Sequence, residues 1–316
     1  MPDCVECRLR RSGPCPVQTP RRKPPVLYDL LIAPFVEFDF MRRALVGIFA
    51  LALSGGPIGV FLMLRRMSLT GDAMAHAILP GAAIGYLVAG FSLPAMTLGG
   101  LAAGFAVALA AGAVARVTIM KEDASLAAFY LISLALGVTI VSMRGSAVDL
   151  LHVLFGNVLA LDDDVLLLLA GVGSVTLIAL AALYRPLVLE CVDPGFLRSV
   201  SRAGGPVHLT FLALVVLNLV AGFHALGTLL AVGLMMLPAA AARFWTADIT
   251  RLLLLASGFG LLSGYAGLVA SYAAGSSLPA GPAVILAAGC LYLLSLVIGT
   301  QGGLARRLLP RPHLQR

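Results

Sequence analysis

The chain has 316 residues, of which 60% are hydrophobic and 12% are charged, and its formal net charge is +7. An average soluble domain has about 25% charged residues, so a soluble globular fold, which needs a charged surface around its core, is excluded. The same hydrophobicity excludes an intrinsically disordered protein. The class that remains is an all-α, polytopic membrane protein.

The positive charge is located at the two ends of the chain. Residues 1–43 and 301–316 carry the whole excess of +7, whereas residues 44–300 are neutral. A nucleic-acid-binding protein spreads its basic residues over a folded face. Basic segments that flank an apolar body favour anionic lipid headgroups instead, so the expected partner is the lipid membrane and not nucleic acid.

The chain begins with two segments that are too polar to cross a bilayer. Residues 1–25 are predicted to be a disordered leader, or the product of an upstream start codon. The leader has three cysteines, but no histidine or fourth cysteine lies near enough to complete a metal site. It has no apolar stretch typical of a signal peptide. Residues 26–43 mix apolar residues with three carboxylates, which predicts an interfacial amphipathic helix.

Residues 44–300 are predicted to form a transmembrane domain. A bilayer core about 30 Å thick needs about 20 apolar residues per crossing helix, and the sequence offers about 8–9 such spans. The candidates are residues 44–64, 74–90, 94–115, 124–143, 165–184, 208–223, 226–244, 251–273 and 281–300. Glycines recur inside them and should let neighbouring helices approach closely, unless glycine is merely common in membrane helices. They include Gly99, Gly100, Gly104 and Gly112.

Two segments interrupt the spans. Residues 148–161 are apolar but too short to cross, and they predict a helix at the outer face. Residues 190–207 form a polar insert, in which Asp193-Pro194 is typical of a helix start and Gly204-Gly205-Pro206 of a helix stop. We expect a short helix here that lies flat on the cytoplasmic side.

Loop charges predict the orientation in the membrane. The loop at 144–164 is acidic and is expected outside, whereas the insert carries arginines and is expected inside. Residues 301–316 then form a cytoplasmic tail. With nine spans the N-terminus lies outside, which conflicts with its basic leader unless the leader is not real or one short segment is re-entrant.

The most informative pair of residues is Asp72 and His76. Their spacing of four places carboxylate and imidazole on one face of a helix, where a span begins. Ionisable residues at membrane depth are functional candidates. The alternative is that Asp72 caps the helix and His76 binds a carbonyl. Pro80-Gly81 should bend the helix just beyond the pair.

Two ligands are too few for a transition-metal ion, which is usually coordinated by about four. A twofold dimer would bring a second Asp72 and His76 to the same axis, and two nitrogens with two oxygens suit zinc or manganese. His152 and His224 are weaker metal candidates, each more typical of a structural role. His208 and His313 are expected to be solvated.

Enzyme signatures are absent from the sequence. It has no His-Glu-x-x-His and no Gly-x-Ser-x-Gly motif. Its two lysines, Lys23 and Lys121, precede Pro and Glu, so it has no Walker A loop for ATP. We therefore expect a protein that is not an enzyme and binds no cofactor tightly.

Four stretches resemble the membrane permease subunits of bacterial zinc/manganese/iron ABC importers, across residues 27–300. They are RRMSLTGDAMAHA at 65–77 with LPG at 79–81, LFGNVLA at 154–160, GTLLAVGLMMLPAAAAR at 227–243, and PAGP at 279–282 leading into LYLLSL at 291–296. Their order along the chain is also that of the family.

The resemblance implies a type II ABC importer permease in the bacterial cytoplasmic membrane. It implies a homodimer that pairs with a cytoplasmic ABC ATPase, which uses the ATP, and with an extracytoplasmic metal-binding protein. The cargo would be zinc, manganese or iron, with Asp72 and His76 along the path. The insert matches the helix that couples to the ATPase, through Asp193, Pro194, Phe196, Arg198 and Gly204.

Two other classes compete with this interpretation. An ion-coupled secondary metal carrier could use the same Asp72–His76 pair to move protons and would work without an ATPase. An intramembrane enzyme would need a second buried carboxylate, and no predicted span offers one.

Overall fold

The computed structural model describes residues 31–90, 92–119, 122–143, 161–192, 204–275, 278–301 and 303–304. The predicted leader at 1–25, the outer-face stretch up to residue 160, the middle of the polar insert at 193–203 and the tail beyond residue 304 lie outside these ranges. Within the described residues, every regular element is a helix.

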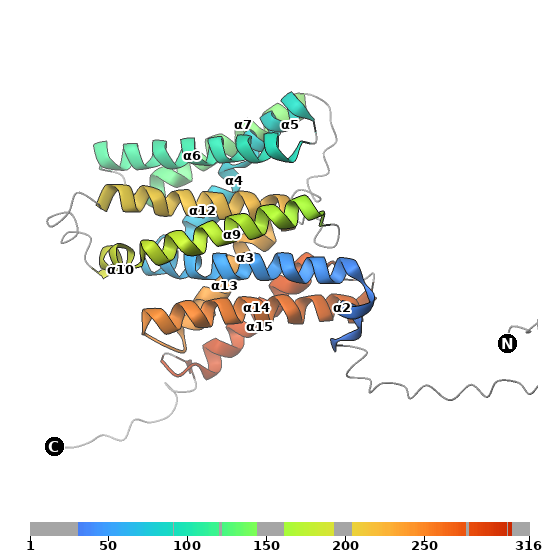
Figure 1. Cartoon of the computed structure of the whole chain (residues 1–316). Helices are drawn as coiled ribbons and strands as arrows, with labels where there is room; N and C mark the ends of the chain where they lie inside the picture. The colour runs from blue at the N-terminus through green and yellow to red at the C-terminus, as the bar shows by residue number, and fades with distance from the viewer. Residues whose placement is uncertain are drawn as a thin grey trace, which may run out of the picture.

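The helices are long, apolar and packed side by side (Figure 1). In chain order they are α2 (Ala33–Glu37), α3 (Asp39–Leu64), α4 (Ser68–Ala77), α5 (Leu79–Ala89), α6 (Leu93–Val117), α7 (Glu122–Met143), α9 (Asp163–Ala182), α10 (Tyr184–Val192), α12 (Gly204–Leu226), α13 (Thr228–Arg243), α14 (Ile249–Ala274) and α15 (Ala280–Ile298). In Figure 1, α6 and α7 lie along one edge, α14 and α15 along the other, and α3, α9 and α12 between them.

Eight helical stretches of the described residues are long and apolar enough to cross a membrane, and the shorter α13 (Thr228–Arg243) is a ninth apolar helix. The prediction of an all-α bundle with about 8–9 spans is therefore confirmed. In the most apolar stretch of α3 and of α12, 67% of the residues are buried inside the protein, against 22% in α6, α7 and α9. The core thus lies around α3 and α12, and the outer helices present apolar side chains to lipid.

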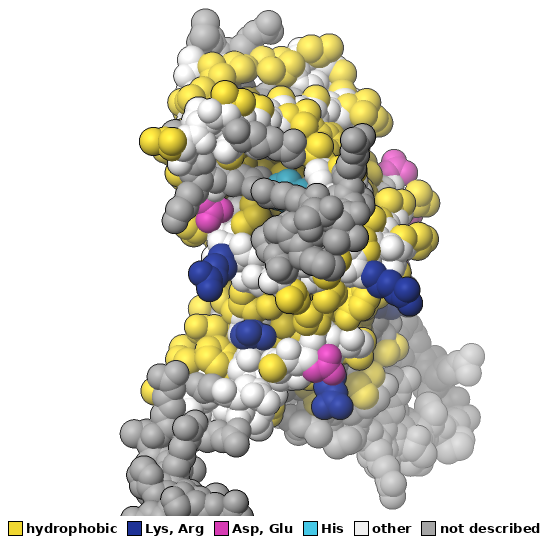
Figure 2. All heavy atoms as spheres, turned by 90° about the vertical axis from the view of Figure 1, so that its left-hand side faces the viewer, with side chains coloured by type: hydrophobic (Ala, Val, Ile, Leu, Met, Phe, Trp, Pro, Cys, Tyr) yellow, Lys and Arg dark blue, Asp and Glu magenta, His cyan; other side chains and the backbone are white. Residues whose placement is uncertain are grey.

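The bundle has two ends of different charge. We call the acidic end the one with Glu37, Asp39, Asp162, Asp163 and Asp164, at the right of Figure 1. The basic end, at the left, has Arg65, Arg66, Arg185, Arg243 and Arg251. Figure 2 looks onto the basic end and shows arginine side chains spread over it. Because cytoplasmic loops carry the excess of Lys and Arg, the basic end is the one expected inside the cell.

Close helix approach at glycines is confirmed at three of the four glycines named above. A Cβ added at Gly99 would lie 2.2 Å from the carbonyl oxygen of Gly81, so the backbones of α5 and α6 are in direct contact. Gly100 and Gly104 face Ile78, Val216 and Val220 side chains in the same way. The prediction is wrong for Gly112, which has no described atom within 4 Å of such a Cβ.

Two element boundaries differ from the expected ones. Helix α3 begins at Asp39, inside the segment 26–43 that the sequence assigns to an interfacial helix. Its first turn tolerates charge because Asp39 pairs with Arg42 and both side chains are exposed. The polar insert is also shorter than 190–207, since its first residues belong to α10 and Gly204 already begins α12.

Candidate functional site

A break between α4 and α5 positions the Asp72–His76 pair. The two helices meet at Ile78, and Pro80 occupies the first turn of α5, where its missing N–H costs no helix hydrogen bond. The bend predicted beyond His76 is therefore present. Helix α7 supports it from the side: the hydroxyl of Ser133 donates to the carbonyl of Ala77 at 3.0 Å, and Gly137 packs against Pro80.

Asp72 and His76 lie one turn apart on α4, as their spacing predicts. His76 Nε2 is 3.8 Å from Asp72 Oδ1, which is too long for a good hydrogen bond but close enough for both groups to share one cation. The Asp72 side chain is 64% exposed and that of His76 27% exposed. The alternative in which Asp72 caps the helix requires a side-chain hydrogen bond at the start of α4, and no such bond is found there.

The pair opens into a cavity of about 280 Å³ between α4, α13 and α15. The other lining residues are Thr228, Leu229, Val232, Gly233, Met236, Leu237 and Ile285. Asp72 and His76 are the two titratable groups in this lining. An apolar cavity with one carboxylate and one imidazole is suited to brief contact with a cation, and the small number of ligands favours release over tight retention.

The His76 side chain packs beside an aromatic ring of α7, and its Nδ1 atom makes no hydrogen bond with the described residues. Its ring stacks against Tyr130 of α7, with 6.2 Å between ring centroids. Its Nδ1 atom is buried and has no hydrogen-bond partner within the described residues. Buried polar nitrogens are normally paired, so an unpaired one calls for an explanation such as strain, a bound water or ion, or a functional role. The ring thus lies against Tyr130 with Nδ1 buried, and Nε2 is the nitrogen on the side of Asp72.

The other histidine candidates do not join the pair. His224 in α12 binds the carbonyl of Val220 through Nδ1 at 2.8 Å and is absent from the cavity lining. His152 lies outside the described residues, as do Asp193, Pro194, Phe196 and Arg198 of the insert. Within the described part of the chain, no cluster of three or more His, Cys, Asp or Glu side chains could hold a metal ion. Asp72 and His76 are thus the candidate ligands that the described part of the chain brings together.

The sequence-based interpretation missed a polar network at the basic end. His208 was expected to be solvated, but its side chain is only 17% exposed, because it packs beside Glu190 and Arg65. Arg65 Nη2 lies 2.5 Å from Glu190 Oε2, and these two side chains are 6% and 15% exposed. Burial raises the pKa of the adjacent Cys191 thiol, against the opposing effect of Arg65. The thiol is thus neutral at physiological pH, and Glu190 is the group that balances the arginine charge.

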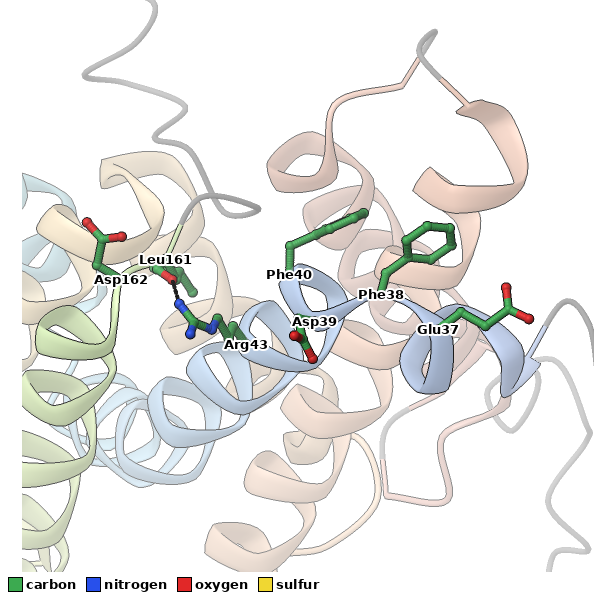
Figure 3. Close-up of a pocket in the computed structure, with 7 residues that line it drawn as sticks. All are labelled: Glu37, Phe38, Asp39, Phe40, Arg43, Leu161 and Asp162. Atoms are coloured by element: carbon green, nitrogen blue, oxygen red, sulfur yellow. Dashed lines mark hydrogen bonds between the residues drawn. The ribbon is translucent and has the colours of Figure 1, made fainter.

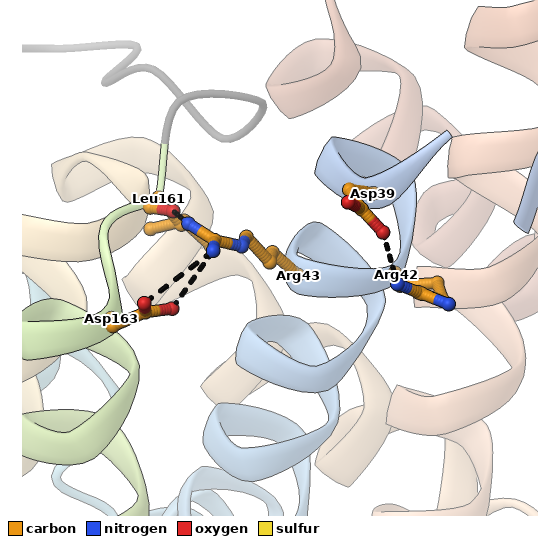
Figure 4. A network of polar contacts seen from close by, with 5 residues as sticks. All are labelled: Asp39, Arg42, Arg43, Leu161 and Asp163. Atoms are coloured by element: carbon orange, nitrogen blue, oxygen red, sulfur yellow. Dashed lines mark hydrogen bonds and ion pairs between the residues drawn. The ribbon is translucent and has the colours of Figure 1, made fainter. Parts of the chain in front are cut away.

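A second cavity, of about 440 Å³, lies at the acidic end (Figure 3). Its lining is contributed by Glu37, Phe38, Asp39, Phe40, Arg43, Leu161 and Asp162. Arg43 bridges α3 to the start of α9, where it reaches the carbonyl of Leu161 and the carboxylate of Asp163, and Arg42 pairs with Asp39 (Figure 4). These exposed pairs contribute little stability. Among the described residues of the acidic end, carboxylates still outnumber arginines.

Comparison with known proteins gives consistent matches over most of the chain. A sequence model of the ABC 3 transport family matches residues 37–299. The manganese import system permease protein ScaB of Streptococcus parasanguinis is 32% identical over 270 residues, which cover 83% of this chain and 91% of that protein. The manganese transport system membrane protein MntC of Halalkalibacterium halodurans is 32% identical over 274 residues, which cover 86% and 91%.

A solved structure matches the fold as well. PsaBC from Streptococcus pneumoniae, in complex with Fab, superposes with a TM-score of 0.75 at 28% identity, over 86% of this chain and 96% of that one. The described helices and their order are thus those of a known membrane protein architecture.

Proposed function

The chain belongs to the ABC 3 transport family, and we propose that it is the membrane permease subunit of an ATP-driven importer whose cargo is the manganous ion. It is a multi-pass protein of the cell membrane. The observation that carries the proposal is the cavity in which Asp72 and His76 face each other beside α13. One oxygen and one nitrogen donor suit manganese, which accepts mixed ligands, and the relatives named above are manganese permeases.

We infer that ATP is used by a separate cytoplasmic ATPase. The sequence has no Gly-Lys-Ser/Thr loop, so this chain cannot hold the nucleotide in that way. The polar insert around 193–203 joins α10 to α12 at the basic end, where an ATPase would dock, and Asp193, Pro194, Phe196, Arg198 and Gly204 are its proposed contacts. At the acidic end we propose an extracytoplasmic metal-binding protein as the donor of the ion. Family membership gives no support to the alternative of an ion-coupled carrier.

We propose further that two copies form the pathway. The Asp72 side chain is 64% exposed although it lies within the span Thr70–Ala89. A carboxylate facing hydrocarbon is costly, and a second copy would cover it and double the ligand set to two oxygens and two nitrogens. The leader, tail and interfacial segment remain assignments from the sequence.

The driving force is tested by uptake into liposomes that contain the permease and its ATPase. We expect manganese to accumulate when ATP is supplied on the ATPase side, and not when a proton gradient is imposed without ATP. Zinc and ferrous iron are measured in parallel, because the donor set does not exclude them. Uptake driven by the proton gradient alone, in liposomes without ATPase, would establish the carrier instead.

The dimer is tested by oxidative cross-linking in membranes, in a variant whose native cysteines are replaced by serine. Leu229 lines the cavity and is 41% exposed, so Leu229→Cys should give a disulfide-linked dimer. Leu98 is 67% exposed on α6, away from the cavity, and Leu98→Cys serves as the matched control. Equal amounts of dimer from both variants, or none from Leu229→Cys, would contradict the shared pathway.

A further inference from the structure

The cavity that Asp72 and His76 line is bounded by α4, α13 and α15, whereas the insert that would meet an ATPase lies in the chain between α10 and α12. The insert is anchored by the end of α10 and the start of α12, whereas the pair lies on α4. For ATP to drive transport, movement of the insert has to reach α4. At the basic end, one charged side chain three residues before α4 contacts residues of both α10 and α12.

That side chain is Arg65. Its guanidinium forms an ion pair with Glu190 of α10 at 2.5 Å and contacts His208 Nδ1 of α12 at 3.2 Å. It also lies over the ring of Phe211, 4.4 Å from the ring centre. His208 Nδ1 in turn lies 3.4 Å from the second oxygen of Glu190, which closes the triangle. The planar guanidinium, with several donors in fixed directions, holds both anchors of the insert at once.

The turn that joins Arg65 to α4 is held by hydrogen bonds to the end of α3. Arg66 adopts a left-handed conformation with φ of 61°, its N–H donates to Met63 at 3.1 Å, and the N–H of Met67 donates to Leu62 at 2.9 Å. These two bonds make the Schellman end of α3. Met67 is buried, and α4 begins at the next residue, so only one turn of helix separates this corner from Asp72.

We propose, on the basis of the function proposed above, that Arg65 is a positioning residue that couples the insert to the metal path. Displacement of α10 and α12 by a docked ATPase pulls on Arg65 through Glu190, His208 and Phe211. The stiff corner at 66–67 passes this displacement to α4, which carries Asp72 and His76. Arg65 itself is not a ligand of the ion and does not line the cavity.

The test measures ATP hydrolysis and manganese uptake separately, in liposomes that contain permease and ATPase. For Arg65→Gln we expect the manganese taken up per ATP hydrolysed to fall by roughly tenfold, within the ~5–150-fold range of typical coupling effects between sites. ATP hydrolysis itself should persist. Arg65→Lys keeps the positive charge but loses the planar guanidinium with its fixed donor directions. It should therefore restore only part of the manganese uptake per ATP hydrolysed. Arg251→Gln, which removes an exposed arginine at the same end, should leave the ratio unchanged.

Loss of one partner of a buried ion pair can destabilise the fold, so a second variant separates coupling from stability. In Arg65→Met/Glu190→Met both charges are removed together, and such replacement is commonly tolerated. The coupling role of Arg65 is supported when this variant unfolds in detergent at the wild-type temperature but still takes up less manganese per ATP hydrolysed. We expect this result because apolar contacts have no fixed direction. The coupling role is overturned when the double variant transports as the wild type does, or when uptake and hydrolysis fall in the same proportion. Absence of ATP-dependent uptake in the wild type would instead refute the proposed function.

Discussion

Replacing His76 by alanine should abolish manganese-dependent growth in a strain that lacks other uptake routes. The imidazole is one of the two proposed ligands in the cavity, and its buried Nδ1 makes no hydrogen bond with the described residues that would serve the fold. We expect uptake to fall by more than the roughly 10–100-fold that follows loss of an outer-shell partner of a metal ligand. Asp72→Asn should have a similar effect, because it removes the charge but keeps the shape.

The growth assay needs proof that the variant protein is in the membrane at wild-type abundance. His313→Ala removes the same imidazole from the C-terminal tail and is the matched control, for which we expect normal growth. Normal uptake by inserted His76→Ala protein would refute its role in the path. Such a result would leave family membership intact, because that rests on the sequence match over residues 37–299.

The second large effect is expected for Gly59→Ala at the crossing of α3 and α13. A Cβ at this position would lie 1.9 Å from the carbonyl oxygen of Met235, which is backbone and cannot rotate away. The two helices would have to separate, and the cavity wall formed by α13 would move with them. We expect a loss of stability at or beyond the upper end of the ~1–3 kcal/mol that overpacking of a core typically costs.

This prediction is measured by thermal unfolding of the detergent-solubilised protein. Gly258→Ala on α14 is the matched control, because a Cβ there meets no atom within 4 Å. The control should unfold at the wild-type temperature, whereas Gly59→Ala should unfold far lower or fail to accumulate. Indistinguishable transitions for the two variants would contradict the direct backbone contact between α3 and α13.

The features that were predictable from the sequence are those that depend on neighbours along the chain. Apolar stretches of bilayer length gave the spans, Pro80 gave the break after α4, and the spacing of four placed Asp72 and His76 on one face. Each of these follows from helix geometry and hydropathy alone.

The features that were missed depend on residues far apart in the sequence. Arg65 meets Glu190 across 125 positions and His208 across 143, so no local pattern distinguishes His208 from a solvated histidine. The start of α3 at Asp39 was missed because an exposed ion pair with Arg42 makes a helix end look too polar to belong to a span. Gly112 was misjudged because composition does not distinguish a glycine at a helix contact from one without a close neighbour.

The most direct test of the manganese path is anomalous X-ray scattering at the manganese absorption edge, from crystals of the permease soaked in saturating manganese. A peak inside the cavity bounded by Asp72, His76 and Thr228, and its loss in an Asp72→Asn/His76→Ala variant, is the predicted result. A manganese peak that persists in that variant, or a cavity that stays empty while manganese binds elsewhere in the membrane domain, would contradict it.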